Sequence, residues 1–257
     1  MEFDISKADN GILLIDKPAG WTSFDVCAKI RGQIRRELQQ AASAEKGKGA
    51  TGAADSLRAP RAEGKPSVVP HITKRQLRVG HAGTLDPFAT GLLIVLLGEA
   101  TKRSDEFLKL DKVYQATIRL GQTSSTGDPE GELSDVSHQE PSLAEVTKAA
   151  QQFVGKISQI PPNYSAIKIN GQRAYKLARA GKTVDMPARQ VEIFAIEVLE
   201  YNYPDLTIQA HVSSGTYIRT LAEDIGALLE TGAFCSQLRR SQIGSYHLSD
   251  RQALSDS

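Results

Sequence analysis

GHAGTLDPFATG (residues 80–91) runs directly into the apolar stretch LLIVLL (residues 92–97). Glycine accepts positive φ and close approach by other backbone, and Pro87 fixes its own φ and biases Asp86 towards an extended conformation. The segment therefore places one carboxylate in a constrained loop beside a fully apolar element. Two interpretations stay open on these residues alone: the loop presents Asp86 for chemistry, or Asp86 caps a helix that begins at Pro87.

Strands are predicted on both sides of this loop. Residues 11–15 and 92–97 are short continuous apolar runs, typical of strands covered on both faces, although the second run also fits a buried helix segment. Residues 113–120 and 206–212 alternate apolar with polar positions, and residues 191–199 form a further apolar-rich run. We expect three more strands at these places.

Helical spacing of apolar residues appears in three segments. The first covers residues 24–38, the second opens with the capping box Ser142-x-x-Glu145, and the third ends before Gly232. The second and third carry the apolar stripes Leu143, Val146, Ala150, Phe153 and Ile218, Leu221, Ile225, Leu228. Strands and helices without a regular βαβ repeat predict an α/β (α+β) fold, in which a mixed, largely antiparallel sheet is flanked by helices.

Residues 39–76 are rich in Ala, Gly, Pro, Ser and charged side chains. With few large apolar residues this stretch cannot offset its ordering entropy, so we expect a disordered, basic, low-complexity insertion. Eight Lys and Arg against three acids give residues 39–78 a net charge of +5, although the whole chain carries only +1. Nucleic-acid binding by the rest of the chain would therefore require basic groups gathered on one face.

The composition argues against several kinds of site. Cys27 and Cys235 are too few for a disulfide framework in 257 residues, so we expect two buried, reduced thiols. His81 has no second His or Cys at ligand spacing, and no phosphate-binding glycine loop is present, so we expect neither metal nor cofactor. Without a signal-peptide pattern or an apolar run of roughly 18 residues, residues 1–257 are expected to form a single cytoplasmic domain with no membrane contact.

Five further motifs accompany the Asp86 loop. They are residues 11–23 (GILLIDKPAGWTS), 99–102 (EATK), 160–168 (IPPNYSAIK), 215–221 (GTYIRTL) and 238–240 (LRR). Together with the loop, this set resembles the TruB family of tRNA pseudouridine synthases over about residues 11–244. The resemblance implies a pseudouridine synthase catalytic fold, here expected without the C-terminal PUA domain that the family commonly adds. In the family the first helix leads almost directly into the Asp loop, so the 39–76 insertion is a departure.

The resemblance also implies a reaction. The family isomerises uridine at position 55 in the T-loop of tRNA to pseudouridine without a cofactor, by breaking the N1–C1′ bond, rotating the base and rejoining it through C5. Asp86 would act as the nucleophile after base flipping, and a glycal-type elimination is a second route that the residues leave open. The expected partner is the T-arm stem-loop of tRNA, bound by a monomer. The alternatives are another RNA stem-loop as substrate, or a non-catalytic tRNA-folding module.

Two residues besides Asp86 receive catalytic roles from the resemblance. Arg219 matches the family's Tyr-Ile-Arg motif and would hold the Asp86 carboxylate ionised, although on its own it also fits an i,i+4 surface pair with Glu223. Tyr114 would stack on the extruded base and accept the C5 proton. A strand tyrosine is otherwise commonly a packing residue, because aromatic side chains are enriched in strands.

Four more residues are expected at the substrate. Tyr217 and Leu238 match family positions that line the uracil pocket. His81 matches the side chain that stacks into the place vacated by the flipped nucleotides. Lys17, in a Lys-Pro turn, is counted with the substrate-binding residues and is expected to support the architecture of the site, although a solvated lysine fits the same turn.

Residues 155–190 interleave basic and aromatic side chains, which suits RNA binding by phosphate contact and stacking. In the family this region resembles a thumb that closes on the T-arm, and a solvated basic face is the alternative. The expected RNA-binding residues are Tyr164, Lys168, Arg173, Tyr175, Lys176 and Arg179.

Overall fold

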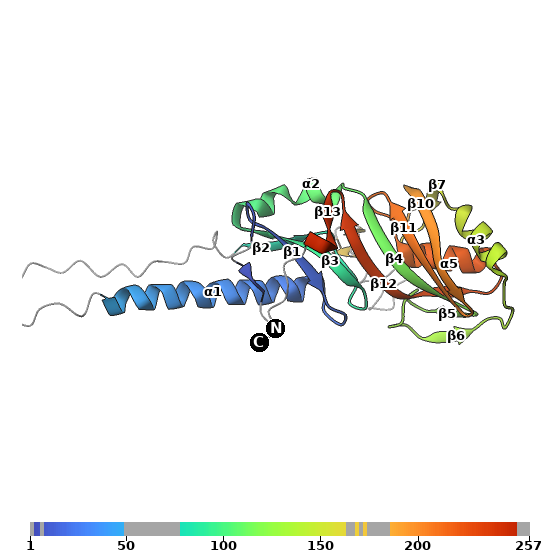
Figure 1. The fold of residues 1–257 in the computed structure, drawn as a ribbon, viewed down its shortest axis with the longest axis horizontal. Coiled ribbons are helices and arrows are strands. Elements are labelled where there is room, and N and C mark those ends of the chain that lie inside the picture. The colour runs from blue at the N-terminus through green and yellow to red at the C-terminus, as the bar shows by residue number, and fades with distance from the viewer. Residues whose placement is uncertain are drawn as a thin grey trace, which may run out of the picture.

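The computed structural model describes residues 3–5, 8–48, 78–162, 168–169, 172–173 and 186–250. Its centre is a nine-stranded sheet in the order β1-β3-β12-β4-β11-β10-β7, with β2 paired to β3 and β13 to β12 (Figure 1). The strands of this sheet are β1 (Ile12–Lys17), β2 (Val79–Ala82), β3 (Thr90–Leu97), β4 (Lys112–Leu120), β7 (Gly155–Gln159), β10 (Arg189–Asn202), β11 (Asp205–Val212), β12 (Ala233–Ile243) and β13 (Tyr246–His247). Two small ladders stand apart: β5 (Gln122–Ser124) with β6 (Leu133–Asp135), and β8 (Lys168–Ile169) with β9 (Gln172–Arg173).

Helices cover parts of the sheet (Figure 1). They are α1 (Ser23–Lys48), α2 (Ser104–Leu108), α3 (Leu143–Gln151) and α5 (Ile218–Leu228), with the 3₁₀ turns η2 (Gly98–Arg103) and η3 (Leu248–Asp250). Helix α5 packs against β12 and α3 against β10, and together they enclose the largest hydrophobic cluster. Helix α1 covers the β1–β3 end, where a second cluster lies. Helices therefore flank a mixed sheet, as the sequence predicts.

Strand β3 explains why LLIVLL shows no alternation. Leu93 and Val95 pack in the cluster under α1, whereas Leu92, Ile94 and Leu96 pack in a third cluster with Phe107 of α2 on the other face. A strand covered on both faces buries every side chain, and so reads as a continuous apolar run. The run is a strand, and the helix interpretation is excluded.

Among the described strands, sheet pairing is antiparallel with one exception, and that exception positions the site. Strand β12 runs parallel to β3, with Arg239 opposite Thr90 and Arg240 opposite Gly91. Gly91 has φ of 103°, and a Cβ there would lie 2.3 Å from the Arg240 carbonyl oxygen. The close approach therefore requires glycine at this position. The predicted mixed, largely antiparallel sheet is confirmed.

The predicted helices form, with corrected margins. The capping box at α3 is confirmed: the Ser142 hydroxyl accepts the Glu145 N–H at 3.3 Å and the Glu145 carboxylate accepts the Ser142 N–H at 2.7 Å. Leu143 and Leu228 were expected in the buried stripes but are 57% and 45% exposed. Each lies at the very end of its helix, where the stripe no longer faces the sheet.

Helix α1 is longer than predicted. It continues to Lys48, so residues 39–48 belong to the helix and not to a disordered insertion. Gln, Ala, Glu and Lys dominate these ten residues and are strong helix formers, so the helix extends without an apolar stripe. Residues 49–76 of the expected insertion lie outside the described residues.

Strand β12 was not predicted, although it lies in the middle of the sheet. Two register shifts, between Cys235 and Gln237 and between Arg240 and Gln242, interrupt its pairing with β4. Each bulge resets which side chains face the core, so the alternation that signals a strand is lost from the sequence.

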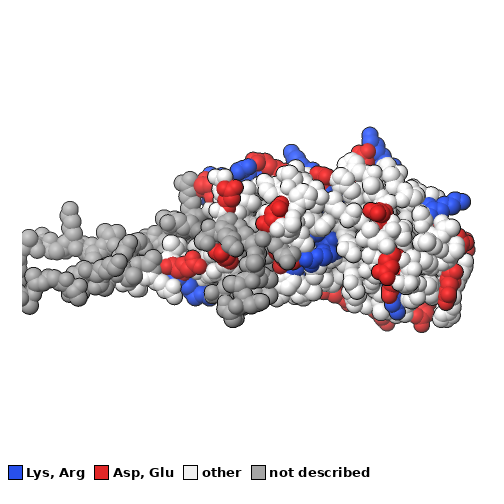
Figure 2. Space-filling model, viewed as in Figure 1, with Lys and Arg blue, Asp and Glu red and all other residues white. Residues whose placement is uncertain are grey.

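Other expectations concern the surface and the thiols. Cys27 and Cys235 are both free and buried, as predicted. No helix among the described residues is long and apolar enough to cross a membrane. Within the same residues no cluster of three His, Cys, Asp or Glu side chains could hold a metal ion. On the face seen in Figure 2, basic and acidic side chains are interspersed.

We expect Gly91→Ala to lose more stability than Gly155→Ala. Both glycines have positive φ, 103° and 109°, but a Cβ at Gly155 meets nothing within 4 Å. Backbone strain of about 1–3 kcal/mol applies to both variants, and only Gly91→Ala also forces β3 away from Arg240. Urea unfolding of the two variants measures the difference. Equal losses would contradict the close approach of β3 and β12.

Candidate active site

A pocket of about 260 Å³ opens between the Asp86 loop, the start of β4 and the N-terminal end of α5. Pockets for drug-sized ligands begin at about 300 Å³, so this one has room for a small ring system such as a nucleobase. Its lining residues are Gly83, Thr84, Leu85, Asp86, Leu108, Lys112, Tyr114, Ser213, Gly215, Thr216, Tyr217, Ile218, Arg219, Leu238 and Arg240. Asp86 is the one acid among them, beside three cations.

The Asp86 loop leads directly into β3, and no helix begins at Pro87. The helix-cap interpretation of Asp86 is therefore wrong. Ser23, at the start of α1, holds the preceding residue from both sides: the Leu85 N–H donates to Ser23 Oγ at 2.9 Å, and that hydroxyl donates to the Leu85 carbonyl at 3.2 Å. The Ala89 N–H donates to the Asp86 carbonyl at 3.2 Å and closes the turn.

Lys17 fixes the residue after Asp86. Its fully buried ammonium donates to the carbonyls of Pro18 at 2.9 Å, Trp21 at 2.6 Å and Pro87 at 3.2 Å. The Gly20 N–H donates to the same Pro87 carbonyl at 2.8 Å. Burial lowers the pKa of Lys17 to about 8, against the attraction of the Asp86 carboxylate. Lys17 is thus a support beneath the loop, neither a solvated lysine nor one of the described residues that line the pocket.

Arg240 holds both ends of the loop and is almost fully buried. Its Nη2 donates to the Gly83 carbonyl at 3.0 Å and its Nη1 to that of Thr84 at 3.5 Å. Its Nε donates to the Leu92 carbonyl at 2.8 Å. No role of its own was predicted for Arg240, because an arginine in a strand normally indicates a solvent-facing position. Its place in the LRR motif is the one signal that pointed to it.

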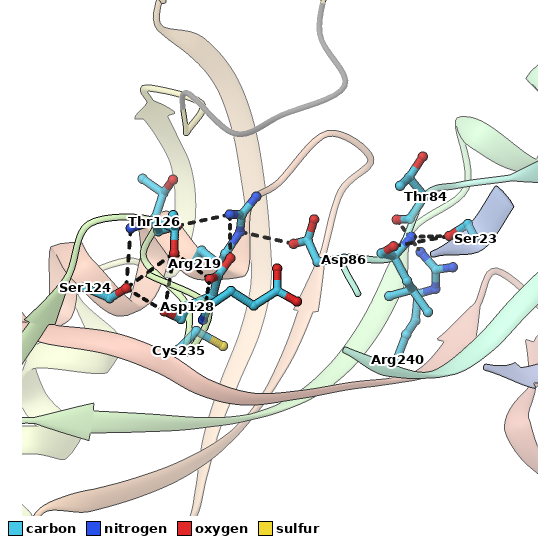
Figure 3. Close-up of polar contacts among 12 residues, drawn as sticks. Ser23, Thr84, Asp86, Ser124, Thr126, Asp128, Arg219, Cys235 and Arg240 are labelled. Carbon is cyan, nitrogen blue, oxygen red and sulfur yellow. Dashed lines mark hydrogen bonds and ion pairs between the residues drawn. The ribbon is translucent and has the colours of Figure 1, made fainter. Parts of the chain in front are cut away.

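Arg219 joins two carboxylates in a buried network (Figure 3). Its Nε lies 3.1 Å from Asp86 Oδ2, its Nη1 lies 2.8 Å from Asp128 Oδ2, and Nη1 also donates to the Thr126 carbonyl at 3.0 Å. The guanidinium is buried, whereas the Asp86 side chain is 31% exposed. The structure therefore brings Asp86 and Arg219 together as expected. A solvated surface pair with Glu223 does not describe Arg219.

Asp128 is a member of the network that sequence reasoning missed. It follows β5 in a Ser, Thr, Gly and Pro-rich stretch, which reads as a polar turn. Thr126 Oγ1 donates to Asp128 Oδ1 at 2.5 Å, and the Glu130 N–H donates to the same oxygen at 3.1 Å. These contacts leave Oδ2 directed at Arg219. No local pattern could show that this turn meets a helix some ninety residues later.

Burial raises the pKa of the Asp86 carboxyl above its ordinary value, and this is the largest effect. The Arg219 guanidinium lowers that pKa, and the Asp128 carboxylate raises it again. An ionised Asp86 is consequently a stronger base and nucleophile than an exposed aspartate. The geometry thus offers a reactive carboxylate at the mouth of a pocket of base size.

Three of the other predicted residues line the pocket, and His81 does not. Tyr114 on β4, Leu238 on β12 and Tyr217 before α5 line the pocket. Tyr217 is fixed through its backbone, because its N–H donates to Gln159 Oε1 at 3.0 Å and its carbonyl accepts from Gln159 Nε2 at 3.1 Å. His81 is half-buried on β2 and is not among the described lining residues.

The expected thumb is described only in part. Lys168 and Arg173 pair across the β8–β9 ladder. Tyr164, Tyr175, Lys176 and Arg179 lie outside the described residues. Their assignment to RNA binding therefore stays a prediction.

We expect Asp128→Asn to lower the pKa of Asp86. The substitution removes the repulsion between the Asp128 and Asp86 carboxylates. It also leaves Asp86 as the one carboxylate of this pair that Arg219 contacts. Both effects favour the ionised form of Asp86. Carboxyl ¹³C NMR titration of wild type and variant measures the shift. Asp135→Asn, an exposed carboxylate on β6, is the control and should leave Asp86 unchanged. A raised or unchanged Asp86 pKa in Asp128→Asn would contradict the network.

Comparison with known proteins identifies the family. Residues 71–218 match the model of the TruB family pseudouridylate synthase (N terminal domain). The chain is 39% identical over 252 residues to tRNA pseudouridine synthase B of Trichormus variabilis, covering 96% of this chain and 71% of that protein. It is 40% identical over 240 residues to tRNA pseudouridine synthase B of Phocaeicola vulgatus, covering 93% and 88%.

Solved structures agree in fold. The Cbf5-Nop10-Gar1 complex contains a chain with TM-score 0.58 and 26% identity, covering 92% of this chain and 50% of its own. The H/ACA RNP bound to a substrate RNA containing 2′-deoxyuridine gives TM-score 0.57 at 24% identity, covering 92% and 48%, which bears on the fold alone. Taken with the Asp86 loop and its pocket, these matches show that the chain belongs to the TruB family and is a pseudouridine synthase of the tRNA-modifying type.

Proposed function

We propose that this enzyme isomerises uridine 55 in the T-loop of tRNA, with Asp86 as the nucleophile. The observation that carries the proposal is the placement of Asp86: it is the one acid among the described residues of the pocket, its loop is fixed by Ser23, Lys17 and Arg240, and Arg219 lies 3.1 Å from its carboxylate. The T-loop position is the substrate expected from the family resemblance. The choice of tRNA as the substrate is supported by relatives that bear the name tRNA pseudouridine synthase B.

The proposed chemistry needs no other reactant. Ionised Asp86 attacks the nucleotide or assists elimination at C2′, and the N1–C1′ bond breaks. The detached base rotates within the pocket, C5 bonds to C1′, and the C5 proton is released to a base. Tyr114 lines the same pocket and is the proposed acceptor of that proton. N1 of the base gains a proton to match the one that C5 loses, by exchange through solvent, and Asp86 leaves unchanged, so atoms and charge balance in an isomerisation.

Base flipping fits the apolar part of the wall. Extruding a base costs a few kcal/mol, and contact with Tyr114, Leu238 and Ile218 would offset it. His81, on β2 and outside the pocket lining, is proposed to stack where the flipped nucleotides leave the loop. The thumb residues of 155–190 are proposed to hold the T-arm by phosphate contact and stacking. The single-domain organisation, the monomeric state and the cytoplasmic location stay expectations.

Another RNA stem-loop is the alternative substrate. It is the second candidate because the pocket has room for a flipped base, which a uridine in another loop also supplies. A non-catalytic RNA-folding module is disfavoured, because binding alone does not require an ion pair of Asp86 and Arg219 in the pocket.

We expect Asp86→Asn to abolish isomerisation, with at least a thousandfold loss of the single-turnover rate, because the amide keeps the shape and removes the nucleophilic charge. Tritium release from [5-³H]uridine in a tRNA transcript measures the rate. Filter binding should show affinity for that tRNA within a few-fold of wild type. Activity within tenfold of wild type would rule out Asp86 as nucleophile.

The same variant should not lose thermal stability at neutral pH. The pKa of Asp86 is higher in the folded protein than in the unfolded chain, so ionisation of Asp86 favours unfolding. The stability that protonated Asp86 contributes at low pH is therefore lost as the pH rises from the unfolded pKa through the folded pKa. Asparagine does not ionise and avoids this loss. Melting curves of wild type and Asp86→Asn are compared at two pH values, one below the pKa of Asp86 in the unfolded chain and one above its pKa in the folded protein. A wild type that melts higher than Asp86→Asn at neutral pH would contradict the direction of the shift.

The T-loop position is tested with two transcripts. We expect unmodified tRNA to acquire one pseudouridine at position 55, mapped by carbodiimide primer extension, and a transcript with cytidine at that position to acquire none. Transcripts of other RNA stem-loops serve as competitors. Modification elsewhere with equal rate would replace the T-loop proposal by the alternative substrate.

A further inference from the structure

Lys112 is a buried cation whose charge the proposed chemistry does not use. It is the first residue of β4, is 6% exposed, and lines the pocket. Its ammonium donates to the Leu108 carbonyl at 2.8 Å and to the Leu110 carbonyl. Because a lysine ammonium has three N–H groups, one donor remains. Lys112 and Tyr114 lie on the same face of β4, roughly 7 Å apart along the strand.

No carboxylate among the described residues contacts Lys112. Asp111 is the neighbouring acid, and its Oδ2 is hydrogen-bonded to Nε2 of His211 at 2.5 Å. Burial is the main reason that the pKa of Lys112 is lowered to about 8; the Arg240 guanidinium acts in the same direction, and the Asp111 carboxylate acts against it. Two buried cations side by side are costly. A neutral amide donor could serve the Leu108 and Leu110 carbonyls at a lower cost.

The pocket as a whole has a surplus of positive charge. Arg219 is compensated by Asp86 and Asp128, whereas the donors of Arg240 and Lys112 meet only backbone carbonyls. In Figure 3, Asp86 lies between Arg219 on one side and Arg240 on the other. Among the described residues, the lining cations without an ion pair are therefore Arg240 and Lys112. A bound anion there would complete the charge balance.

We propose that Lys112 binds the phosphodiester next to the reacting uridine and so sets the sugar over Asp86. This inference rests on the proposed function, since it assumes that a nucleotide enters the pocket. A charge-assisted hydrogen bond from the remaining N–H to a phosphate oxygen is the contact. Arg240, which holds the loop and lines the same pocket, adds a second positive charge. Lys112 is a specificity and positioning residue for RNA, because a free uracil or uridine lacks the phosphate.

The experiment combines a change in the protein with a change in the RNA. The substrates are T-arm stem-loops with a neutral methylphosphonate at either the 5′ or the 3′ phosphate of the target uridine. The proteins are wild type, Lys112→Gln, which removes the charge and keeps a donor, and Lys109→Met as the matched control. Lys109 is exposed, lies in the same segment and does not line the pocket. Single-turnover rate and Kd are measured for each pair.

We expect wild type to lose about tenfold or more in single-turnover rate over Kd with one of the two methylphosphonates. Lys112→Gln should show a similar loss on the natural stem-loop and no further loss on that methylphosphonate, because the two changes remove the same contact. Lys109→Met should respond like wild type. Two results would overturn the proposal. In the first, Lys112→Gln loses a further factor on the methylphosphonate stem-loop as large as the factor that wild type loses there. In the second, Lys112→Gln modifies the natural stem-loop at the wild-type rate.

Two further arms keep the outcome decisive. Melting curves show whether Lys112→Gln is folded, and Lys112→Arg, which keeps the charge, should restore sensitivity to the methylphosphonate even if the Gln variant is unstable. An insensitive Lys112→Arg with a sensitive wild type would count against a charge contact. If wild-type protein modifies no natural stem-loop, the proposed function fails, and the coupling in Kd alone still tests the Lys112 contact.

Discussion

The guanidinium of Arg240 is the contact on which the site depends, because it ties the central strand β12 to both ends of the Asp86 loop. Its donors reach the carbonyls of Gly83, Thr84 and Leu92, the last of them 148 residues away in sequence. Its backbone pairs with Gly91 in the one parallel contact of the sheet. The loop therefore reaches its shape only when β12 has joined β3. Fold and site form together, and neither is determined by local sequence.

Buried cations hold the loop because its backbone carbonyls need hydrogen-bond donors. A loop that bends sharply leaves carbonyls without partners, and each would be costly to bury alone. Lys17 and Arg240 supply several donors each from a single side chain, so that two residues satisfy the carbonyls on both sides of Asp86. The desolvation of these cations lowers the stability of the fold, but their hydrogen bonds keep the Asp86 side chain in one direction.

The sequence predicts this fold where periodicity survives. The strands at 113–120 and 206–212 and the capping box of α3 follow from alternation and from Ser142 and Glu145. Strand β12 does not follow, because its two bulges reset the alternation. Residues 39–48 were wrongly predicted as part of a disordered insertion, because a segment with high helix propensity but no apolar face resembles a low-complexity sequence. At the site, the motifs pointed to Asp86 and Arg219, but Asp128 and Arg240 depend on contacts between distant segments that no local pattern records.

Charge explains why the pocket combines residues from so many elements. One arginine between two carboxylates keeps Asp86 oriented without neutralising it fully, because Arg219 is shared with Asp128. Burial then holds the pKa of Asp86 above that of a surface aspartate, so its carboxylate, when ionised, is the stronger base. The other two lining cations, Arg240 and Lys112, form no ion pair within the part of the chain that the structure describes, and their donors meet backbone carbonyls. Such a pocket is incomplete by itself, and a polyanionic substrate that brings its own phosphate beside a neutral base supplies the missing charge where the cations lie.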